Sequence, residues 1–333
     1  MLREILSEHF QLQIEEPLSV GRYESGRIKN QIYMLVPVNS LPEENLSELM
    51  QLSTHVLNQG DRNTCQFLQK ESGESVIESQ QGKYVVLVCH MSTNRNQQHI
   101  GRKLSKFHYR GRTINFQTNK INRIGKWKQY WEQRLDQMER VWNDMLYKQP
   151  DHEFERLFLE AFPYYMGLAE NAIQYLVDTE LDDDPQAVDS GTICHVRFTK
   201  HTWGNQIYMK NPFEWVFDHC SRDLAEWTRD RYFTNIKLYE PEVSQFFQDY
   251  QTVMPLSSFS WRLLYARLLF PLHFFDNVEN YYITSSEQEK NSLQDRFVKS
   301  LDQTKEHEEF LSSFYQLAEV PVRRMKIPKL DWL

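Results

Sequence analysis

Apolar residues come in short runs over the first ninety positions, a pattern typical of strands in a small sheet. IYMLVPV (32–38) is the strongest early run, and Gly21 and Gly26 separate the shorter ones. Further along, KYVVLVCH (83–90) follows SVIES (75–79) after a turn. We expect these runs to form one sheet.

Between these strands the apolar positions follow a helical period. In LPEENLSELMQLSTHVLNQG (41–60) the apolar residues fall on one face, and Gly60 is a natural end for the helix. Residues 1–91 are therefore expected to form a small sheet plus one helix, with a hinge near residues 86–91.

The remainder of the chain is predominantly helical. Apolar stripes at helical spacing run through residues 99–112 and 126–146, and the aromatic stripe that begins at Trp127 is more often core than a cofactor site. A further helical stretch, 153–178, contains Pro163, where we expect a kink or a break. Two or three long helices are expected to end the chain.

Residues 191–227 interrupt this helical region. An apolar strand end delivers His195, a polar loop follows, and a second apolar run ends at Asp218. The chain thus runs as a sheet with a helix, then helices, then a loop between two short strands, then helices. This order predicts an α+β fold with two lobes, over residues 1–91 and 92–333.

Composition narrows the function classes. The 333 residues include 40% hydrophobic and 14% aromatic residues, enough for a sizeable core, and a formal charge of −8 argues against non-specific binding to nucleic acid. The most apolar stretch is interrupted by Arg267 and Pro271 and is shorter than the about 20 residues of a membrane-spanning helix. The charged N-terminus lacks the apolar core of a signal peptide, so we expect the protein to be made and kept in the cytosol.

The cysteines are few and far apart. Cys65, Cys89, Cys194 and Cys220 form no C-x-x-C pair, so we expect reduced, mostly buried thiols and neither a zinc site nor a redox motif. Cys194 directly precedes His195, and consecutive strand residues point to opposite faces. We therefore do not expect this pair to act as a nucleophile and its base.

Three segments carry a resemblance to known proteins. CHVRFTKHTW, EWVFDHCSRDLAEWTRD and LLYARLLFPLHFFDNVENYY resemble the aminoglycoside-phosphotransferase and choline-kinase branch of the protein-kinase-like fold, and more closely the spore coat proteins of the CotS and YutH type. The resemblance covers nearly the whole chain. It implies a bilobal fold with a β-rich N-lobe, a helical C-lobe and a degenerate catalytic loop within residues 191–227.

The family's catalytic base is a carboxylate two residues after the loop His, and that position is Arg197 here. Arginine stays protonated and cannot take up the substrate's proton. Arg197 could still hold a phosphate or carboxylate. We favour a structural ion pair with a local acid, Asp218 or Asp223.

The family's metal-binding positions are matched only in part. Its Asn corresponds to Thr202 without a gap and to Asn205 with three extra residues, and a simple Gly-Asn turn explains Asn205 equally well. Asp218 ends a hydrophobic strand, as the family's metal-binding Asp does, but one carboxylate alone is a weak Mg²⁺ site. The alternative is that Asp218 caps a helix or pairs with an arginine.

The nucleotide-binding parts are largely missing. The expected third strand, IYMLVPV, contains no lysine, and Lys29 precedes it. Glu48 is placed to be the family's helix Glu, but without a lysine partner we expect a helix-surface acid. The stretch GRYESGR (21–27) lacks the spacing of a phosphate-binding glycine loop.

Two groups of polar residues suggest metal binding, each with a simpler explanation. His195, His201 and His219 with Asp218 could form a His/His/Asp site, although a structural role for each His is more common. The acidic stretch DTELDDDPQ (178–186) is most simply a solvated turn, with cation binding as the alternative.

Together these residues predict a kinase-fold protein without kinase activity. The resemblance implies a structural component or assembly factor of the bacterial endospore coat, made in the mother-cell cytoplasm, with other coat proteins as partners. No cofactor is expected to be required, and binding of Mg-ATP is disfavoured. The alternative is an active small-molecule or protein phosphotransferase with a rewired ATP and Mg²⁺ site built on Asp218. The C-terminal segment 320–333 could dock on a partner, but we favour its packing on its own lobe.

Overall fold

The structure is a computed structural model, and it describes residues 1–91, 99–148, 150, 152–204, 207–330 and 332. Contacts divide the chain into two compact units: Met1–Asn122 with Gly191–Asp223, and Arg123–Ser190 with Leu224–Leu333. The lobe boundary expected after residue 91 adjoins residues 92–98, which lie outside the described residues, so that boundary stays a prediction.

The first unit is built on a six-stranded antiparallel sheet in the order β1-β2-β3-β6-β4, with β5 also paired to β6. Its strands are β1 (Glu16–Val20), β2 (Tyr23–Ile28), β3 (Gln31–Pro37), β4 (Gln66–Phe67), β5 (Ile77–Ser79) and β6 (Gly82–His90). The strands expected at 32–38, 75–79 and 83–90 are therefore confirmed as β3, β5 and β6.

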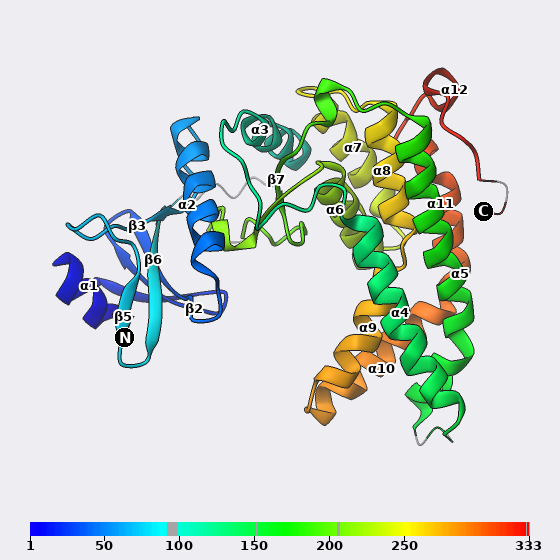
Figure 1. Ribbon diagram of the computed structural model, residues 1–333, viewed down its shortest axis with the longest axis horizontal. Coiled ribbons are helices and arrows are strands. Elements are labelled where there is room, and N and C mark those ends of the chain that lie inside the picture. The colour runs from blue at the N-terminus through cyan, green and yellow to red at the C-terminus, as the bar shows by residue number, and fades with distance from the viewer. Residues whose placement is uncertain (92–98, 149, 151, 205–206, 331, 333) are drawn as a thin grey trace. The chain divides into compact units, whose positions relative to one another are not determined.

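Two helices, α1 (Leu2–Phe10) and α2 (Glu43–Asn58), lie on opposite faces of this sheet (Figure 1). α2 is the helix expected at 41–60, and Gly60 follows it with φ of 81°. The expectation of a single helix was wrong, because α1 buries Leu2, Ile5 and Leu6 against the side chains of the other sheet face. The N-terminal charges lie on its outward side.

The rest of the first unit carries the region that resembles a catalytic loop. It comprises α3 (Ile100–Arg112), β7 (Thr192–His195), the 3₁₀ turn η2 (Pro212–Glu214), β8 (Trp215–Asp218) and the first turn of α6 (Ser221–Thr234). β7 and β8 form an antiparallel pair, with Thr192 opposite Asp218 and His195 opposite Trp215. The two strands expected around the loop are thus confirmed.

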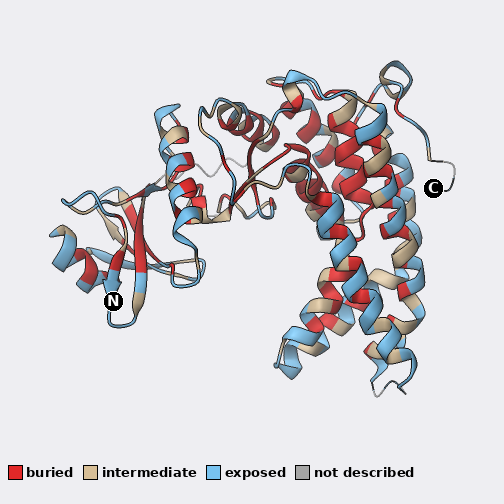
Figure 2. Ribbon diagram, in the orientation of Figure 1, coloured by how far each residue is buried: buried red, intermediate tan, exposed pale blue. Residues whose placement is uncertain are grey.

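The second unit is helical. It contains α4 (Trp127–Leu146), α5 (Glu153–Asp182), η1 (Ala187–Asp189), the remainder of α6, α7 (Tyr239–Gln251), α8 (Ser258–Leu269), α9 (Leu272–Ile283), α10 (Glu287–Asp302), α11 (Thr304–Leu317) and α12 (Val322–Met325). α8 is almost entirely buried (Figure 2). In the described residues, no helix combines the length and apolar character needed to cross a bilayer.

Two expectations for the second unit were wrong. α5 continues through Pro163, because Phe158, Phe162 and Tyr165 bury its apolar face on both sides of the proline. More than two or three helices follow β8, since breaks such as the one before Pro271 divide the apolar C-terminal sequence into shorter helices. The acidic stretch 178–186 was expected as a turn, but its first part belongs to α5.

Two of the four cysteines are paired rather than reduced. Cys65 and Cys89 form a disulfide with a Cα–Cα distance of 4.5 Å, whereas Cys194 and Cys220 are buried thiols. The pairing follows from the antiparallel register, in which Gln66 lies opposite Val88. Cys65, just before Gln66, therefore lies across from Cys89, just after Val88. The sequence alone gives no register for so short a strand as β4.

Glu48 is a buried anchor of α2, not the surface acid expected from the sequence. It is 9% exposed, and its carboxylate accepts hydrogen bonds from the backbone N–H groups of Asn119, Lys120 and Ile121 at 2.9–3.1 Å. The carbonyl of Ile121 in turn accepts from Phe217 N–H of β8 at 3.0 Å. Glu48 therefore ties α2 to the segment that flanks β8.

Three histidines, the buried His108 and His307 and the half-buried His273, favour the neutral state. Burial lowers the pKa of His108 to about 4 and that of His307 to about 3, and burial beside His307 and Arg229 holds the pKa of His273 well below its ordinary value. Each must stay unprotonated for the fold to keep its packing.

The Glu48 contacts predict a large loss of stability on truncation. Glu48→Ala leaves three N–H groups without their acceptor, so we expect the free energy of unfolding to fall by about 3 kcal/mol. Urea denaturation followed by circular dichroism measures it. Glu44→Ala, one turn earlier and exposed, is the control. Equal and small losses in both variants would show that the anchor is not stabilising.

The buried histidines predict loss of stability in mild acid. Above pH 6.5 both states are neutral at these positions, and below it the unfolded chain binds protons that the folded chain excludes. Stability should then fall by about 1.4 kcal/mol per pH unit for each such histidine. For His108 this continues down to about pH 4 and for His307 to about pH 3.

Urea midpoints measured between pH 7.5 and pH 4.5 test this expectation. His307→Gln should flatten the profile, while His9→Gln, at an exposed position, serves as the control. A wild-type midpoint that does not move across this range would contradict the assignment.

Candidate functional site

The loop region is held in place by α3 and the β7–β8 pair. A Cβ added at Gly111 would lie 2.6 Å from the backbone nitrogen of Ile193, so only glycine lets α3 approach β7 this closely. Thr192 Oγ1 donates to the carbonyl of His108 at 2.7 Å. His195 therefore lies at the end of a strand that is fixed to α3.

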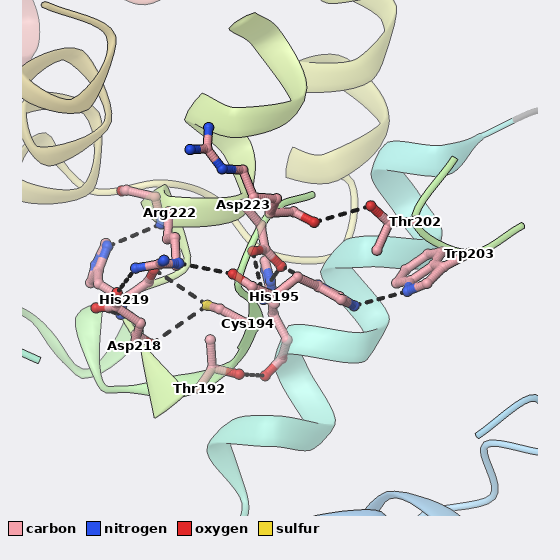
Figure 3. A network of polar contacts seen from close by, with 12 residues as sticks. Thr192, Cys194, His195, Thr202, Trp203, Asp218, His219, Arg222 and Asp223 are labelled. Carbon is pink, nitrogen blue, oxygen red and sulfur yellow. Dashed lines mark hydrogen bonds and ion pairs between the residues drawn. The ribbon is translucent and has the colours of Figure 1, made fainter. Parts of the chain in front are cut away.

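Asp223 is the centre of the polar network shown in Figure 3. Its Oδ1 accepts from His195 N–H at 2.8 Å, and its Oδ2 accepts from His195 Nδ1 at 2.7 Å and from His108 Nε2 at 3.1 Å. Burial acts to raise the pKa of Asp223, but the hydrogen bonds donated by the two histidines outweigh it and hold that pKa below its usual value. Both carboxylate oxygens of Asp223 therefore accept hydrogen bonds from within the protein.

Trp203 fixes the protonation of His195. Its indole Nε1–H donates to His195 Nε2 at 2.9 Å, and an indole nitrogen is only ever a donor. Nε2 must therefore be unprotonated, and the ring proton sits on Nδ1, where it is donated to Asp223. His195 is neutral, and both of its ring nitrogens are occupied.

Asp218 is paired with an arginine of its own chain. The side chain is 1% exposed; its Oδ2 accepts from Arg222 at 3.0 Å and its Oδ1 from His219 N–H at 2.8 Å. The same guanidinium donates to the carbonyls of His195 at 2.8 Å and Val196 at 3.1 Å. Of the two alternatives for Asp218, the geometry matches the arginine pair.

The residue at the expected base position lies in a tight turn. Arg197 is exposed, and its carbonyl accepts from Thr202 Oγ1 at 3.1 Å, while Thr202 Oγ1 accepts from Thr199 N–H at 2.8 Å. The expected pairing of Arg197 with Asp218 or Asp223 stays a prediction; the two histidines donate to Asp223, and Arg222 donates to Asp218. Asn205 lies outside the described residues. Gly204 precedes it with φ of 80°.

The other predicted site residues do not converge on a metal or a nucleophile. Cys194 Sγ faces the carbonyls of His219 and Asp218 at 3.4 and 3.7 Å, so it does not meet His195, and burial raises its pKa well above the ordinary value. His219 Nδ1 accepts from Ser221 N–H at the start of α6, and His201 is exposed.

Among the described residues, the group of His, Cys, Asp and Glu that lies within reach of one ion is His108, Cys194 and Asp223, not the set expected around Asp218. All three are fully buried, and both oxygens of Asp223 already accept hydrogen bonds. The nucleotide-binding positions are likewise unmatched. β3 contains no lysine, and Lys29 is exposed in the turn before it with φ of 54°.

A second cluster of charged side chains was not predicted from the sequence. Lys210 Nζ lies 2.5 Å from Asp61 Oδ2, which also accepts from Arg110 at 2.7 Å. The ammonium sits over the rings of Phe107 and Trp203 at 4.8 and 4.6 Å, and burial lowers its pKa although Asp61 opposes the shift. Nothing in the sequence signals it, since its members are up to 149 residues apart.

Arg222 was also missed, although its spacing offered a signal. It follows Asp218 by four residues, the separation at which acidic and basic side chains commonly pair in helices. His108 gave no such signal, because an apolar helix stripe with one His does not reveal a partner in α6.

The chain is similar to known proteins along nearly its whole length. The family model described as "Spore coat putative kinase YutH" matches residues 3–314. The endospore coat-associated protein YutH of Bacillus subtilis (strain 168) is 38% identical over 335 residues, covering 100% of this chain and 98% of that protein.

Solved structures show the fold. An aminoglycoside phosphotransferase from Alicyclobacillus acidocaldarius has a TM-score of 0.69 at 15% identity, covering 96% of this chain and 97% of that one. The microcompartment-associated aminopropanol kinase has a TM-score of 0.59 at 12% identity, with 93% and 97% covered. The expected aminoglycoside-phosphotransferase-like α+β fold is confirmed. With a family match from residue 3 to residue 314 and a relative aligned along its full length, this chain belongs to the YutH family of spore coat putative kinases.

Proposed function

We propose that this protein serves the bacterial endospore coat as a structural component or assembly factor and does not transfer phosphate. It would be made in the mother cell and deposited in the coat, with other coat proteins as its partners. Support for the coat role comes from the family and from the coat-associated relative that is 38% identical.

The observation that carries the proposal of inactivity is the Arg222–Asp218 pair. Phosphoryl transfer in this fold uses an Asp at the end of this strand to hold Mg²⁺ against the nucleotide phosphates. Here the Arg222 guanidinium occupies one oxygen of Asp218 and the His219 N–H the other, in a buried setting. The residues present therefore do not fit a magnesium ion at Asp218 unless the hydrogen bond from Arg222 to this carboxylate is displaced.

The remaining positions support the same proposal. Arg197 stays cationic where a proton acceptor is needed. No lysine on β3 offers a charge to the phosphates, and Glu48, which would hold such a lysine, is committed to backbone amides. Removing base, metal ligand and phosphate-binding lysine together removes the electrostatic stabilisation on which the reaction depends.

A rewired phosphotransferase is the second candidate, and Glu214 favours it. This residue stands directly before β8, and its carbonyl accepts from Val196 N–H at 2.7 Å, next to Arg197. Burial raises the pKa of its carboxyl group. A raised pKa suits a general base, so Glu214 would take the role that Arg197 cannot fill.

Nucleotide titration separates these two candidates. For the proposed scaffold, we expect about 1 mM Mg-ATP to leave the melting temperature of the purified protein unchanged. A site with a dissociation constant of about 10 μM would instead stabilise it by about 2.7 kcal/mol. Calorimetric titration and an ATP-consumption assay provide the direct readouts.

Asp218→Asn and Glu214→Gln are the informative variants, with circular dichroism as the check on folding. The scaffold proposal fails if wild type binds Mg-ATP and Asp218→Asn abolishes that binding. Turnover that disappears in Glu214→Gln would in addition establish the rewired base.

Coat association tests the biological half of the proposal. A fluorescent fusion of the full chain, expressed in sporulating Bacillus subtilis without its own relative, is expected to gather at the spore surface. Arg197→Ala and Glu214→Gln, separately, should leave that pattern unchanged, because no turnover is involved. Fluorescence that stays diffuse for the wild-type chain would exclude the coat role, and loss in Glu214→Gln alone would indicate that catalysis matters.

A further inference from the structure

A long groove runs along the outward face of α2, in the first unit and apart from the loop region. Its volume is about 1120 Å³, and its walls are α2 on one side and residues 70–78 on the other. The α2 residues that line it recur every three or four positions, from Glu43 through Leu46 and Met50 to Asn58. That spacing is one continuous face of the helix, so the groove follows α2 from end to end.

The dimensions suit an extended peptide. Fifteen steps separate Glu43 from Asn58, and at 1.5 Å per residue the groove is about 22 Å long. An extended chain advances about 3.3 Å per residue, so about seven residues fill this length. Pockets for small molecules are usually compact hollows rather than troughs that follow a whole helix.

The wall opposite α2 is the edge of the sheet. In the described part of the chain, β5 pairs with β6 and has no strand on its other side. In an antiparallel strand every second residue turns its N–H and C=O away from the partner, so β5 presents main-chain groups at its free edge. Val76 and Glu78, at and beside this edge, line the groove.

Ser75 is an independent observation that favours a polar partner in the groove. Its hydroxyl group is buried and has no hydrogen-bond partner among the described residues, and Ser75 also lines the groove. A buried polar group without a partner is costly and is rare in folded proteins. A peptide main chain at the free edge would supply both donors and acceptors to this side of the groove.

The charge along the groove points to an uncharged occupant. Lys70 pairs with Glu74 at 3.3 Å and Lys83 with Glu78 at 3.1 Å, so the charges on the strand side neutralise each other. Apolar lining residues, among them Leu46, Met50, Val76 and Phe116, are spread along the groove. Alternating apolar and small polar side chains would match it.

We propose that this groove binds an extended, uncharged segment of about seven residues from a partner protein, which adds to β5 as a further strand and packs its side chains against α2. Strand addition at a sheet edge beside a helix is a common mode of peptide recognition. The proposal goes beyond the coat role and does not depend on catalytic inactivity, because the groove and the loop region use different residues.

Selection from a phage-displayed library of random heptapeptides, against the purified full chain, provides the probe. Enriched peptides should bind the wild type, and Gln51→Arg should weaken binding at least tenfold because the new side chain fills the groove. Gln59→Arg, the same change just past the end of α2 and outside the groove, is the matched control and should have no effect. Ser47→Arg repeats the test if Gln51→Arg does not fold.

Backbone N-methylation of an enriched peptide, one position at a time, tests the strand geometry. We expect loss of binding only at one or two positions, two residues apart, because β5 has three residues and only every second N–H of the peptide can face it. The proposal is overturned if no peptide is enriched, if Gln51→Arg and Ser47→Arg leave binding intact, or if methylation of consecutive N–H groups is equally damaging. The last outcome would indicate a helical ligand. Self-association of the chain that Gln51→Arg abolishes would instead assign the groove to a second copy.

Discussion

The ion pair between Arg222 and Asp218 is the interaction on which the geometry of the loop region depends. All three guanidinium nitrogens of Arg222 donate hydrogen bonds, one to the Asp218 carboxylate and two to the carbonyls of His195 and Val196. The next residue, Asp223, accepts the N–H of His195. Two consecutive residues at the start of α6 therefore hold both the N–H and the C=O of His195 and fix the end of β7 to the end of β8.

In this arrangement, side chains of the protein itself neutralise or hydrogen-bond the buried carboxylates. In a nucleotide-dependent enzyme of this fold, buried carboxylates face a space that a metal ion and phosphates complete. Here Arg222 and the two histidines complete the carboxylates from within the chain, and Trp203 satisfies the last ring nitrogen. Buried charges are tolerated when every partner is present. The frame of the site thus stays intact without a ligand.

Periodicity predicted the elements that bury one regular face, and it failed where contacts join distant backbone to side chains. α2, α3, α4, β3, β5 and β6 all follow their apolar patterns. The disulfide of Cys65 and Cys89 could not be predicted, because β4 has only two residues and its register comes from the assembled sheet. Glu48 was expected at the surface for a similar reason, because its partners are the backbone N–H groups of residues 119–121. Nearly every residue has such a group, so the sequence does not indicate which ones a carboxylate will bind.

Among the site residues, too, residue types were informative from the sequence and contact partners were not. A structural role for His195 was expected from the sequence, but its partner Trp203, eight residues later, was not; that contact depends on the turn at residues 199–202. The pairing of Asp218 with an arginine was weighed as an alternative without a candidate. Residue type therefore indicated which side chains differ from the family pattern, while only the fold shows which groups pair with Asp218 and His195.

Glu48 also bears on the groove that runs along α2. In an enzyme of this fold the helix Glu must meet a lysine, and the position of its helix controls activity. Here the carboxylate holds the backbone beside β8 instead, so α2 is fixed from its inner face. A helix fixed in this way presents its outer stripe in one position, and a wall that is already ordered costs less entropy when a peptide binds. The contacts of Glu48 with the backbone thereby support the proposed binding of a peptide along the same helix.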